Sequence, residues 1–334
     1  MMKTGVRTIL LMALSAVVAG LGAATYFYQG DIQQARARVS SGSLIALTPC
    51  GPIEYAVAGD GPPVLVVHGA GGGFDQGIEL SAPLIEQGFR IIAMSRFGYL
   101  RTPLPHDASP AAQADAHACL LDTLGIERVA VIGGSAGAPS SLQFALRYPE
   151  RITALVLLVP ATYVPRPNDA PPVNTPPGLE LLLDTAMRSD ILFWAVSTFA
   201  RETAIRTILA TPPAVVMQAS NAEQARVQQI LDHIQPISQR RPGLLNEAAV
   251  IPSLQRYDLE RITVPTLTIG CADDLFGTYD GARYTAEQIP GARFVDYPDG
   301  GHLWVGHQQE VMQEIVRFFR ENKSSYTISP GVAG

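Results

Sequence analysis

A single serine between glycines is the most chemically informative feature of this chain. In the stretch "VAVIGGSAGAPS", Ser135 follows an apolar run typical of a buried strand, and Gly133 and Gly137 lie two residues to either side of it. A sharp turn from strand into helix holds such a serine in a strained backbone conformation, and the flanking glycines remove side chains that would clash. The pattern predicts a hydroxyl exposed at the carboxyl end of a sheet, where ligands bind in open α/β folds.

A serine hydroxyl becomes a useful nucleophile only when a histidine accepts its proton and a carboxylate orients that histidine. Both kinds of residue follow later in the chain, in the order serine, acid, histidine that this kind of α/β sheet uses. The segment "CADD" supplies Asp273 and Asp274 after an apolar run, and "DGGHLW" supplies His302 in a glycine-rich loop. Because adjacent residues at a strand end point in different directions, only one of the two carboxylates can face His302, and the residues alone leave this choice open.

Acyl transfer also needs N–H donors for the oxyanion that forms on the substrate. The natural candidates are the backbone amides of Ala136, next to the nucleophile, and of Ala70, in "HGAGGG" after another apolar run. The same glycines could begin a dinucleotide-binding turn, but Phe74 occupies the third glycine position and the strand "RIIAMSR" lacks the acidic residue that would bind a ribose. We therefore expect no cofactor and no metal.

Short apolar runs alternate with helical segments from Ser43 onward, which is typical of a parallel sheet covered by helices. One helix is predicted in detail, because Ser109 can cap it, Pro110 suits its first position and Gly125 can end it. The apolar runs, which we expect to be central strands, are residues 62–69, 90–96, 128–135, 154–161 and 264–270. The fold class predicted is therefore α/β, with a mostly parallel central sheet flanked by helices.

The alternation breaks between about residues 162 and 250, where a proline-rich stretch precedes several helical segments. We interpret residues 163–250 as a helical lid inserted between two parts of the core, residues 43–162 and 251–334. Seven large apolar residues of this segment suggest an apolar acyl or alcohol group in the substrate, although such a stripe equally fits packing of the lid onto the core. They are Leu181, Leu182, Leu183, Ile191, Phe193, Trp194 and Phe199.

The first 42 residues differ from the rest of the chain. An uncharged run of 21 residues, Thr8 to Tyr28, is long enough to cross a hydrocarbon core of about 30 Å. Its aromatic end, Tyr26–Tyr28, favours a retained membrane anchor over a signal peptide cleaved near Ala24. We expect residues 8–28 to contact the membrane and residues 29–42 to form a polar linker. The catalytic domain would then lie outside the cytoplasm, or be exported if the segment is cleaved.

Charge and cysteine content exclude further classes of function. The formal net charge is −6 and no basic run occurs, which argues against nucleic acid as a partner. The three cysteines, Cys50, Cys119 and Cys271, show no CxxC spacing. We therefore expect buried thiols rather than a disulfide framework or a zinc site.

Motifs at five separate places together resemble the α/β-hydrolase superfamily. They are "VVHGAGGGFDQG", "SRFGYLRTP", "VIGGSAGAPSSLQFALRYPERI", "TIGCADD" and "GGHLWVGH". The resemblance implies an α/β-hydrolase fold and a catalytic triad of Ser135, His302 and an aspartate, with Ala70 and Ala136 at the oxyanion. Spacing in the family favours Asp273 as the acid, with Asp274 as the alternative. The segment "SRFGYLRTP" departs from many relatives, which carry an aspartate where this chain has Ser95.

The hypothesis that follows is a serine hydrolase that cleaves a carboxylic ester of a small molecule through an acyl-enzyme. A serine at this position argues against the superfamily's dehalogenases and epoxide hydrolases, which use aspartate there. Thioesterase, peptidase, carbon–carbon hydrolase and perhydrolase activities remain open alternatives. A non-catalytic ligand-binding protein on the same fold is the alternative from another class.

Overall fold

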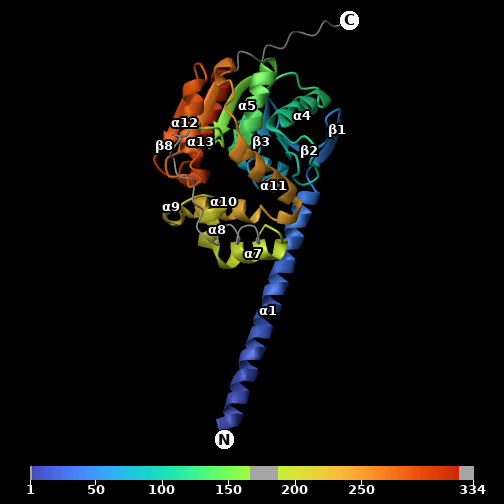
Figure 1. The fold of residues 1–334 in the computed structure, drawn as a ribbon, viewed down its shortest axis with the longest axis vertical. Helices are drawn as coiled ribbons and strands as arrows, with labels where there is room; N and C mark the ends of the chain where they lie inside the picture. Colours follow the sequence, from blue (N-terminus) through green and yellow to red (C-terminus); the bar gives the residue numbers. More distant parts are fainter. Residues whose placement is uncertain (1, 166–186, 323–334) are drawn as a thin grey trace.

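Residues 2–165 and 187–322 are described by a computed structural model. Within them the strands form one eight-stranded sheet with the order β1-β2-β4-β3-β5-β6-β7-β8 (Figure 1). Strand β2 is antiparallel to both neighbours, and β3 to β8 run parallel. The strands are β1 (Leu44–Thr48), β2 (Gly51–Ala58), β3 (Pro63–Val67), β4 (Arg90–Met94), β5 (Val129–Gly134), β6 (Ile152–Leu158), β7 (Thr266–Cys271) and β8 (Arg293–Tyr297).

The mostly parallel α/β sheet predicted from the sequence is confirmed, and the five expected central strands are β3 to β7. Strand β4 lies beside β3 on one side. The chain then crosses to β5, which lies beside β3 on the other side. The strand order therefore reverses between β3 and β5, and ligands of open α/β sheets bind at such a point. The loops that follow these two strands carry Ala70 and Ser135.

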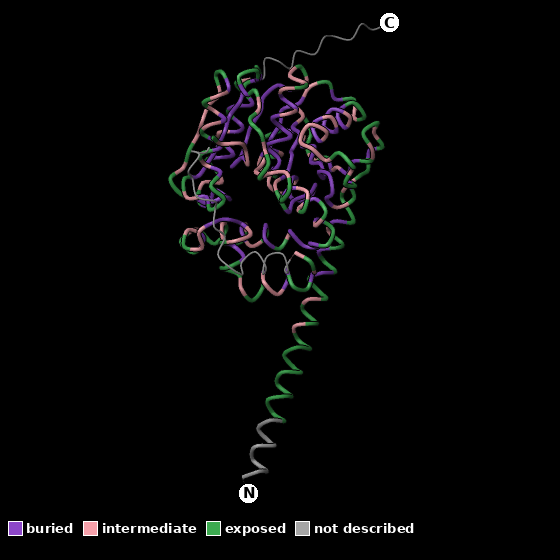
Figure 2. The backbone as a smooth tube through the Cα atoms, in the orientation of Figure 1, coloured by how far each residue is buried: buried purple, intermediate pink, exposed green. Residues whose placement is uncertain are grey.

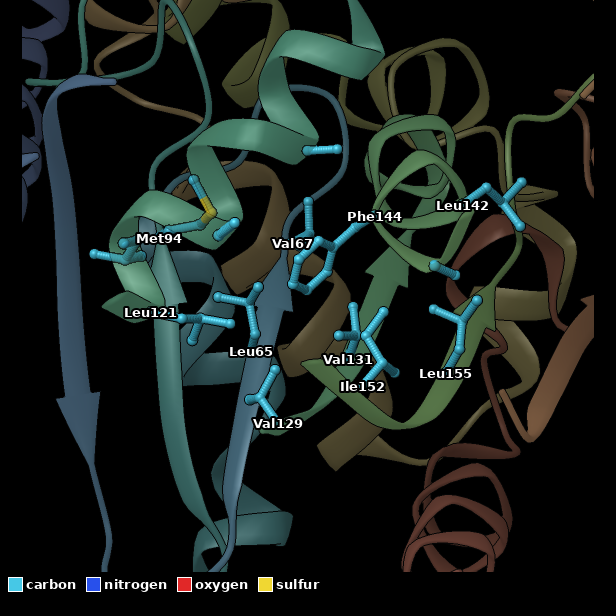
Figure 3. Packing of buried hydrophobic residues seen from close by; sticks show 14 of the residues in the cluster. Leu65, Val67, Met94, Leu121, Val129, Val131, Leu142, Phe144, Ile152 and Leu155 are labelled. Atoms are coloured by element: carbon cyan, nitrogen blue, oxygen red, sulfur yellow. The ribbon is translucent and has the colours of Figure 1, made fainter. Parts of the chain in front are cut away.

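Alternating side chains of the central strands build two apolar layers. On β3, Leu65 and Val67 belong to the layer that packs under α4 and α5 (Figure 3), whereas Val64 and Val66 belong to the layer under α13. This alternation is the period of two that a strand covered on both faces requires. The core helices are α2 (Phe74–Leu80), α3 (Ala82–Glu86), α4 (Pro110–Thr123), α5 (Ala138–Arg147), α12 (Tyr279–Gln288) and α13 (Gln308–Glu321). Ser109 caps α4 as predicted, because its hydroxyl accepts the Ala112 N–H at 3.2 Å.

The segment inserted between β6 and β7 is helical where the structure describes it. We call residues 187–250 the insertion; residues 166–186, including Leu181, Leu182 and Leu183, lie outside the described part. Figure 1 shows its helices beside one another on the side of the sheet nearer the N-terminus. A separate apolar cluster holds the insertion together and includes Leu303, which follows His302, and Val305 of the same loop. Its helices are α7 (Asp190–Phe199), α8 (Arg201–Thr207), α9 (Pro213–Gln218), α10 (Asn221–Asp232) and α11 (Arg241–Val250).

The first helix, α1 (Met2–Ser40), continues through the residues that the sequence predicts as a linker. By length and composition it could cross a membrane, and its most apolar window is not buried by the protein. Its last part is different, since Ile32, Ala35 and Val39 are buried (Figure 2). Arg38 donates to the buried Asp75 carboxylate at 3.2 Å. The linker prediction is therefore wrong, because every third or fourth residue of 29–40 packs against the globular part.

The expectation of three free thiols is also wrong. Cys50, in the turn between β1 and β2, is bonded to Cys119 of α4, with the two Cα atoms 6.1 Å apart. The pair is separated by 69 residues, so only the packing of α4 beside the first hairpin reveals it. Cys271 is a free, buried cysteine, and burial raises the pKa of its thiol to about 12.

Replacement of Ile32 by alanine tests whether the end of α1 belongs to the folded domain. Ile32 is 3% exposed, whereas Leu21, earlier in the same helix, is 64% exposed. We expect Ile32→Ala to lower the free energy of unfolding by about 2–5 kcal/mol, because it removes buried methylene groups and leaves a cavity. Leu21→Ala is the matched control and should leave the stability unchanged. Denaturant unfolding of the full chain in detergent measures both, and equal stabilities would contradict the packing of α1.

Candidate active site

Ser135 lies where β5 turns into a short helical turn that leads to α5. Its φ is +46°, a left-handed value that costs energy for any residue with a side chain. Such strain at the end of a buried strand turns the hydroxyl away from the sheet. The geometry of this turn is the one predicted from the glycine spacing.

The glycines on either side of Ser135 are required by close contacts. A Cβ on Gly133 would lie 2.5 Å from Ser141 Oγ, and one on Gly137 would lie 2.4 Å from the carbonyl oxygen of Val67. Real Cβ contacts are essentially never shorter than 3.0 Å. The two glycines thus let α5 and the end of β3 approach the serine turn closely.

His302 lies in the loop that follows β8 and contacts the serine directly. Its Nε2 is 2.9 Å from Ser135 Oγ, and its ring is almost fully buried. Gly300 and Gly301 precede it with φ values of +117° and +60°, which suit glycine. These two glycines allow the loop to turn the imidazole toward the end of β5.

The carboxylate that contacts His302 belongs to Asp274 and not to Asp273. Asp274 Oδ2 is 2.8 Å from His302 Nδ1, and the Asp274 side chain is completely buried. Its other oxygen, Oδ1, accepts the Phe276 N–H at 2.8 Å, and the Thr278 hydroxyl donates to Oδ2. A carboxylate can only accept, so Nδ1 of His302 carries the proton and Nε2 is free to accept one from Ser135.

The preference for Asp273 is therefore corrected by the structure. After β7 ends at Cys271, the chain makes a tight turn in which the Asp274 N–H donates to the Cys271 carbonyl at 3.2 Å. This turn brings Asp274 back toward the sheet. Asp273 instead accepts the Gly301 N–H at 2.7 Å, so it holds the histidine loop rather than the histidine ring.

The loop after β3 packs directly against the serine. A Cβ on Gly69 would lie 3.1 Å from Ser135 Cβ, so the peptide that precedes Ala70 is next to Ser135. The carbonyl of Gly69 accepts from His68 Nδ1 at 2.7 Å and from Arg96 Nη2 at 3.2 Å. A peptide held at its carbonyl has its N–H fixed in the opposite direction, and the N–H of this peptide belongs to Ala70.

His68 is a structural residue beside the site. Its Nε2 accepts the backbone N–H of Arg96 at 3.0 Å, so the ring proton is on Nδ1. Burial, together with the nearby Arg96 guanidinium, holds the pKa of His68 well below its usual range. The ring is thus neutral and donates to the Gly69 carbonyl.

Arg96 and Glu247 support the site from positions that the sequence does not indicate. Arg96 Nη1 donates to the Ala136 carbonyl at 3.0 Å, and its Nη2 forms an ion pair with Glu247 of α11. Both side chains are less than a tenth exposed. One guanidinium therefore contacts the peptides beside Ala70 and Ala136 and also the insertion. An arginine in a segment after a strand carries no local signal for this role.

The insertion also contacts the loops that carry Asp274 and His302. The Ala210 carbonyl accepts the Leu275 N–H at 3.0 Å and the His302 N–H at 3.4 Å. A Cβ on Gly301 would lie 2.7 Å from the Thr211 Cα, so the insertion packs tightly on the histidine loop. Among residues 11–165 and 187–322 no cluster of three His, Cys, Asp or Glu side chains could hold a metal ion.

Comparison with known proteins identifies the family of this chain. A family model for the alpha/beta hydrolase fold matches residues 62–305. The chain is 30% identical over 282 residues to an uncharacterised hydrolase, YcgS, of Bacillus subtilis, a match that covers 81% of this chain and 96% of that protein. It is also 30% identical over 286 residues to a 2-hydroxy-6-oxononadienedioate/2-hydroxy-6-oxononatrienedioate hydrolase of Paraburkholderia xenovorans, covering 80% and 90%.

Solved structures show the same fold. An alpha/beta hydrolase fold protein from Nakamurella multipartita superposes with a TM-score of 0.63 at 25% identity, covering 83% of this chain and 99% of that one. An esterase from Exiguobacterium antarcticum shares the fold with a TM-score of 0.65 at 17% identity, covering 83% and 98%. The chain therefore belongs to the α/β-hydrolase superfamily, and it is an enzyme of that hydrolase family.

Asparagine substitutions of the two adjacent aspartates distinguish their roles. We expect Asp274→Asn to lower kcat on a p-nitrophenyl ester by about 10⁴-fold, the loss typical when the carboxylate of a Ser-His-Asp triad becomes an amide. Asp273→Asn is the matched control, because an amide oxygen can still accept the Gly301 N–H, and it should retain most of the activity. The opposite ranking of the two variants would contradict the pairing of His302 with Asp274.

Proposed function

We propose that this hydrolase cleaves a carboxylic ester through an acyl-enzyme formed on Ser135. The observation that carries the proposal is the continuous hydrogen-bonded path from Ser135 Oγ to His302, 2.9 Å, and from His302 to Asp274, 2.8 Å. Nucleophile and base within about 2.6–3.2 Å of each other, with the base oriented by a third group, are the requirement for an activated serine.

In the proposed reaction, Ser135 Oγ attacks the acyl carbonyl carbon while His302 Nε2 accepts the hydroxyl proton. The imidazolium, stabilised by Asp274, then donates this proton to the oxygen of the departing alcohol as the ester bond breaks. A water molecule gives its proton to the same nitrogen and attacks the acyl-enzyme. When this second intermediate collapses, the proton returns to Ser135 Oγ and the carboxylic acid leaves.

The backbone N–H groups of Ala70 and Ala136 are proposed as the donors to the oxyanion. Their support is the anchoring of this region by Arg96, which contacts the Gly69 and Ala136 carbonyls, and the close approach of Gly69 to Ser135. Donors that are fixed before the reaction need no reorganisation when charge develops on the substrate. Removal of one such donor typically costs about 10²–10³ in kcat.

Four of the seven large apolar residues expected to contact the acyl group lie in α7. Phe193 and Trp194 are buried within the insertion, whereas Ile191 and Phe199 are exposed. The two buried side chains therefore pack the insertion, and the two exposed ones lie on its surface. We also propose that the insertion is a lid over the site, which is supported by the hydrogen bonds of the Ala210 carbonyl with the loops that carry Asp274 and His302.

Carbon–carbon bond hydrolysis is the second candidate. It is favoured by the relative from Paraburkholderia xenovorans, a 2-hydroxy-6-oxononadienedioate/2-hydroxy-6-oxononatrienedioate hydrolase, of which this chain covers 90%. The same serine, histidine and aspartate would serve it. Turnover of a vinylogous 1,5-diketone in preference to a panel of esters would decide for this candidate.

We also propose that α1 is a retained membrane anchor with the catalytic domain on the extracytoplasmic side. The Cys50–Cys119 disulfide supports this side of the membrane, because disulfides persist in oxidising compartments. A cleaved signal sequence would place the domain in the same compartment.

Labelling with a fluorophosphonate tests for an activated serine without knowledge of the substrate. We expect one adduct on the full chain in detergent, mapped to Ser135 by intact mass and peptide analysis. It should be absent from Ser135→Ala and His302→Ala and present in Asp273→Asn. A folded wild-type protein that gives no adduct would contradict the serine mechanism and favour a ligand-binding role.

Thiol alkylation tests the compartment. After rapid alkylation of intact cells without reductant, we expect Cys50 and Cys119 to remain unmodified and linked, and to react only after reduction. The buried Cys271 serves as the internal control, because it should react only after unfolding. Free Cys50 and Cys119 thiols in the cell would place the domain in a reducing compartment instead.

A further inference from the structure

One face of α7 is apolar and exposed to solvent. Ile191, Leu192 and Phe199 are 46%, 42% and 71% exposed. At 3.6 residues per turn these side chains share one face of the helix, and Phe193, Trp194 and Ser197 are buried on the other. Three large apolar side chains on one exposed face mark a surface that binds another apolar surface. We call Ile191, Leu192 and Phe199 the α7 stripe.

Helix α1 contacts α7 directly through three side-chain interactions. Trp194 Nε1 donates to Asp31 Oδ2 at 2.7 Å, and Arg36 forms an ion pair with Asp190 at 3.3 Å. The rings of Tyr28 and Trp194 meet edge to face, with centroids 5.6 Å apart. Because α1 is continuous from Met2 to Ser40, these contacts determine how the domain is oriented on the helix.

The length of the apolar part of α1 determines the height of α7 above the membrane. The uncharged run from Thr8 to Tyr28 is about 30 Å long at 1.5 Å per residue, which matches the hydrocarbon core of a bilayer. Its last residue, Tyr28, contacts α7 through Trp194. Figure 1 shows α7 beside α1 on the side of the domain that faces the N-terminal end.

We infer that the α7 stripe lies in the interfacial layer of the bilayer that α1 crosses, so that the partner of this face is the lipid surface. An amphipathic helix of this kind buries its apolar face at the boundary between headgroups and acyl chains. Tyr28, Trp194 and Phe199 form a chain of rings at this level, with Trp194 and Phe199 centroids 5.5 Å apart. Aromatic side chains are enriched at that depth.

The position of α7 at the membrane also indicates a substrate class, and this step rests on the proposed esterase function. The insertion would lie between the lipid surface and the catalytic loops, because its apolar cluster reaches from Phe193 of α7 to Leu303 beside His302. An ester dissolved in the membrane would then reach Ser135 by way of the insertion. The substrate class inferred is therefore a lipophilic ester that partitions into the bilayer.

Depth-dependent fluorescence quenching tests the contact with lipid. The full chain is reconstituted in phosphatidylcholine vesicles containing a tenth phosphatidylglycerol, with an NBD label on Leu192→Cys or Phe199→Cys. Glu127→Cys, exposed in the loop before the amino end of the central strand β5, is the matched control, and Leu14→Cys reports the span itself. The native cysteines do not compete, since two are disulfide-bonded and Cys271 is buried.

We expect nitroxide lipids labelled near the headgroup to quench the probes at 192 and 199 strongly and the probe at 127 hardly at all. Quenching at 14 with none at 192 or 199 would overturn the inference, because the helix would span while α7 stays in water. Absence of quenching at 14 would overturn it as well. The NBD emission at 199 could instead shift to shorter wavelength as the number of protein copies per vesicle rises, with no quenching by the nitroxide lipids. That result would assign the α7 stripe to a second copy of the chain and reject the lipid surface.

Kinetics separate this inference from the esterase proposal. We expect Leu192→Asp to lower kcat/KM several-fold on a long-chain ester carried in vesicles and to leave hydrolysis of water-soluble p-nitrophenyl acetate unchanged. An equal loss on both substrates would contradict lipid-side access. If the wild type hydrolyses neither ester and takes no fluorophosphonate, the esterase proposal fails, whereas the quenching result still decides whether α7 contacts lipid.

Discussion

The two hydrogen bonds of the His302 ring are the constraint on which the rest of the structure depends. They require side chains from the loops after β5, β7 and β8 to meet within about 3 Å, a tolerance set by hydrogen-bond geometry. A parallel sheet meets this requirement because the carboxyl ends of its strands lie at one edge. The strained φ of Ser135 and the glycines before His302 are local consequences of bringing these loops together.

Buried ion pairs connect the loops around Ser135 and His302 to the insertion and to α1. Arg96 links the Gly69 and Ala136 carbonyls to Glu247 of α11, and Asp75 binds both Arg240 and Arg38. Burial of a single ion costs several kcal/mol unless a partner compensates it, so each of these contacts holds its segments in one arrangement. Through Arg38 helix α1 takes part in this network, since Arg240 also donates to the Gly72 carbonyl in the glycine-rich loop.

The packing of the end of α1 on the globular part means that residues 29–40 belong to the folded domain. The sequence of residues 29–42 is polar enough to suggest a linker, yet its sparse apolar residues recur at helical spacing and are buried. Polar composition says little about burial when only one face of a helix packs. The same limit applies to Cys50 and Cys119, whose pairing depends on the packing of a hairpin against α4.

By itself the sequence determined the alternation of strands and helices, the serine turn and the histidine loop. These features depend on periodicity and on glycine at defined positions, both of which act between near neighbours in the chain. Only the tertiary structure decided which aspartate meets His302, that Arg96 and Ala210 support the site, and that α1 joins the domain. Each of these depends on the direction of a side chain or a carbonyl across segments far apart in sequence, and a one-residue difference, as between Asp273 and Asp274, reverses that direction.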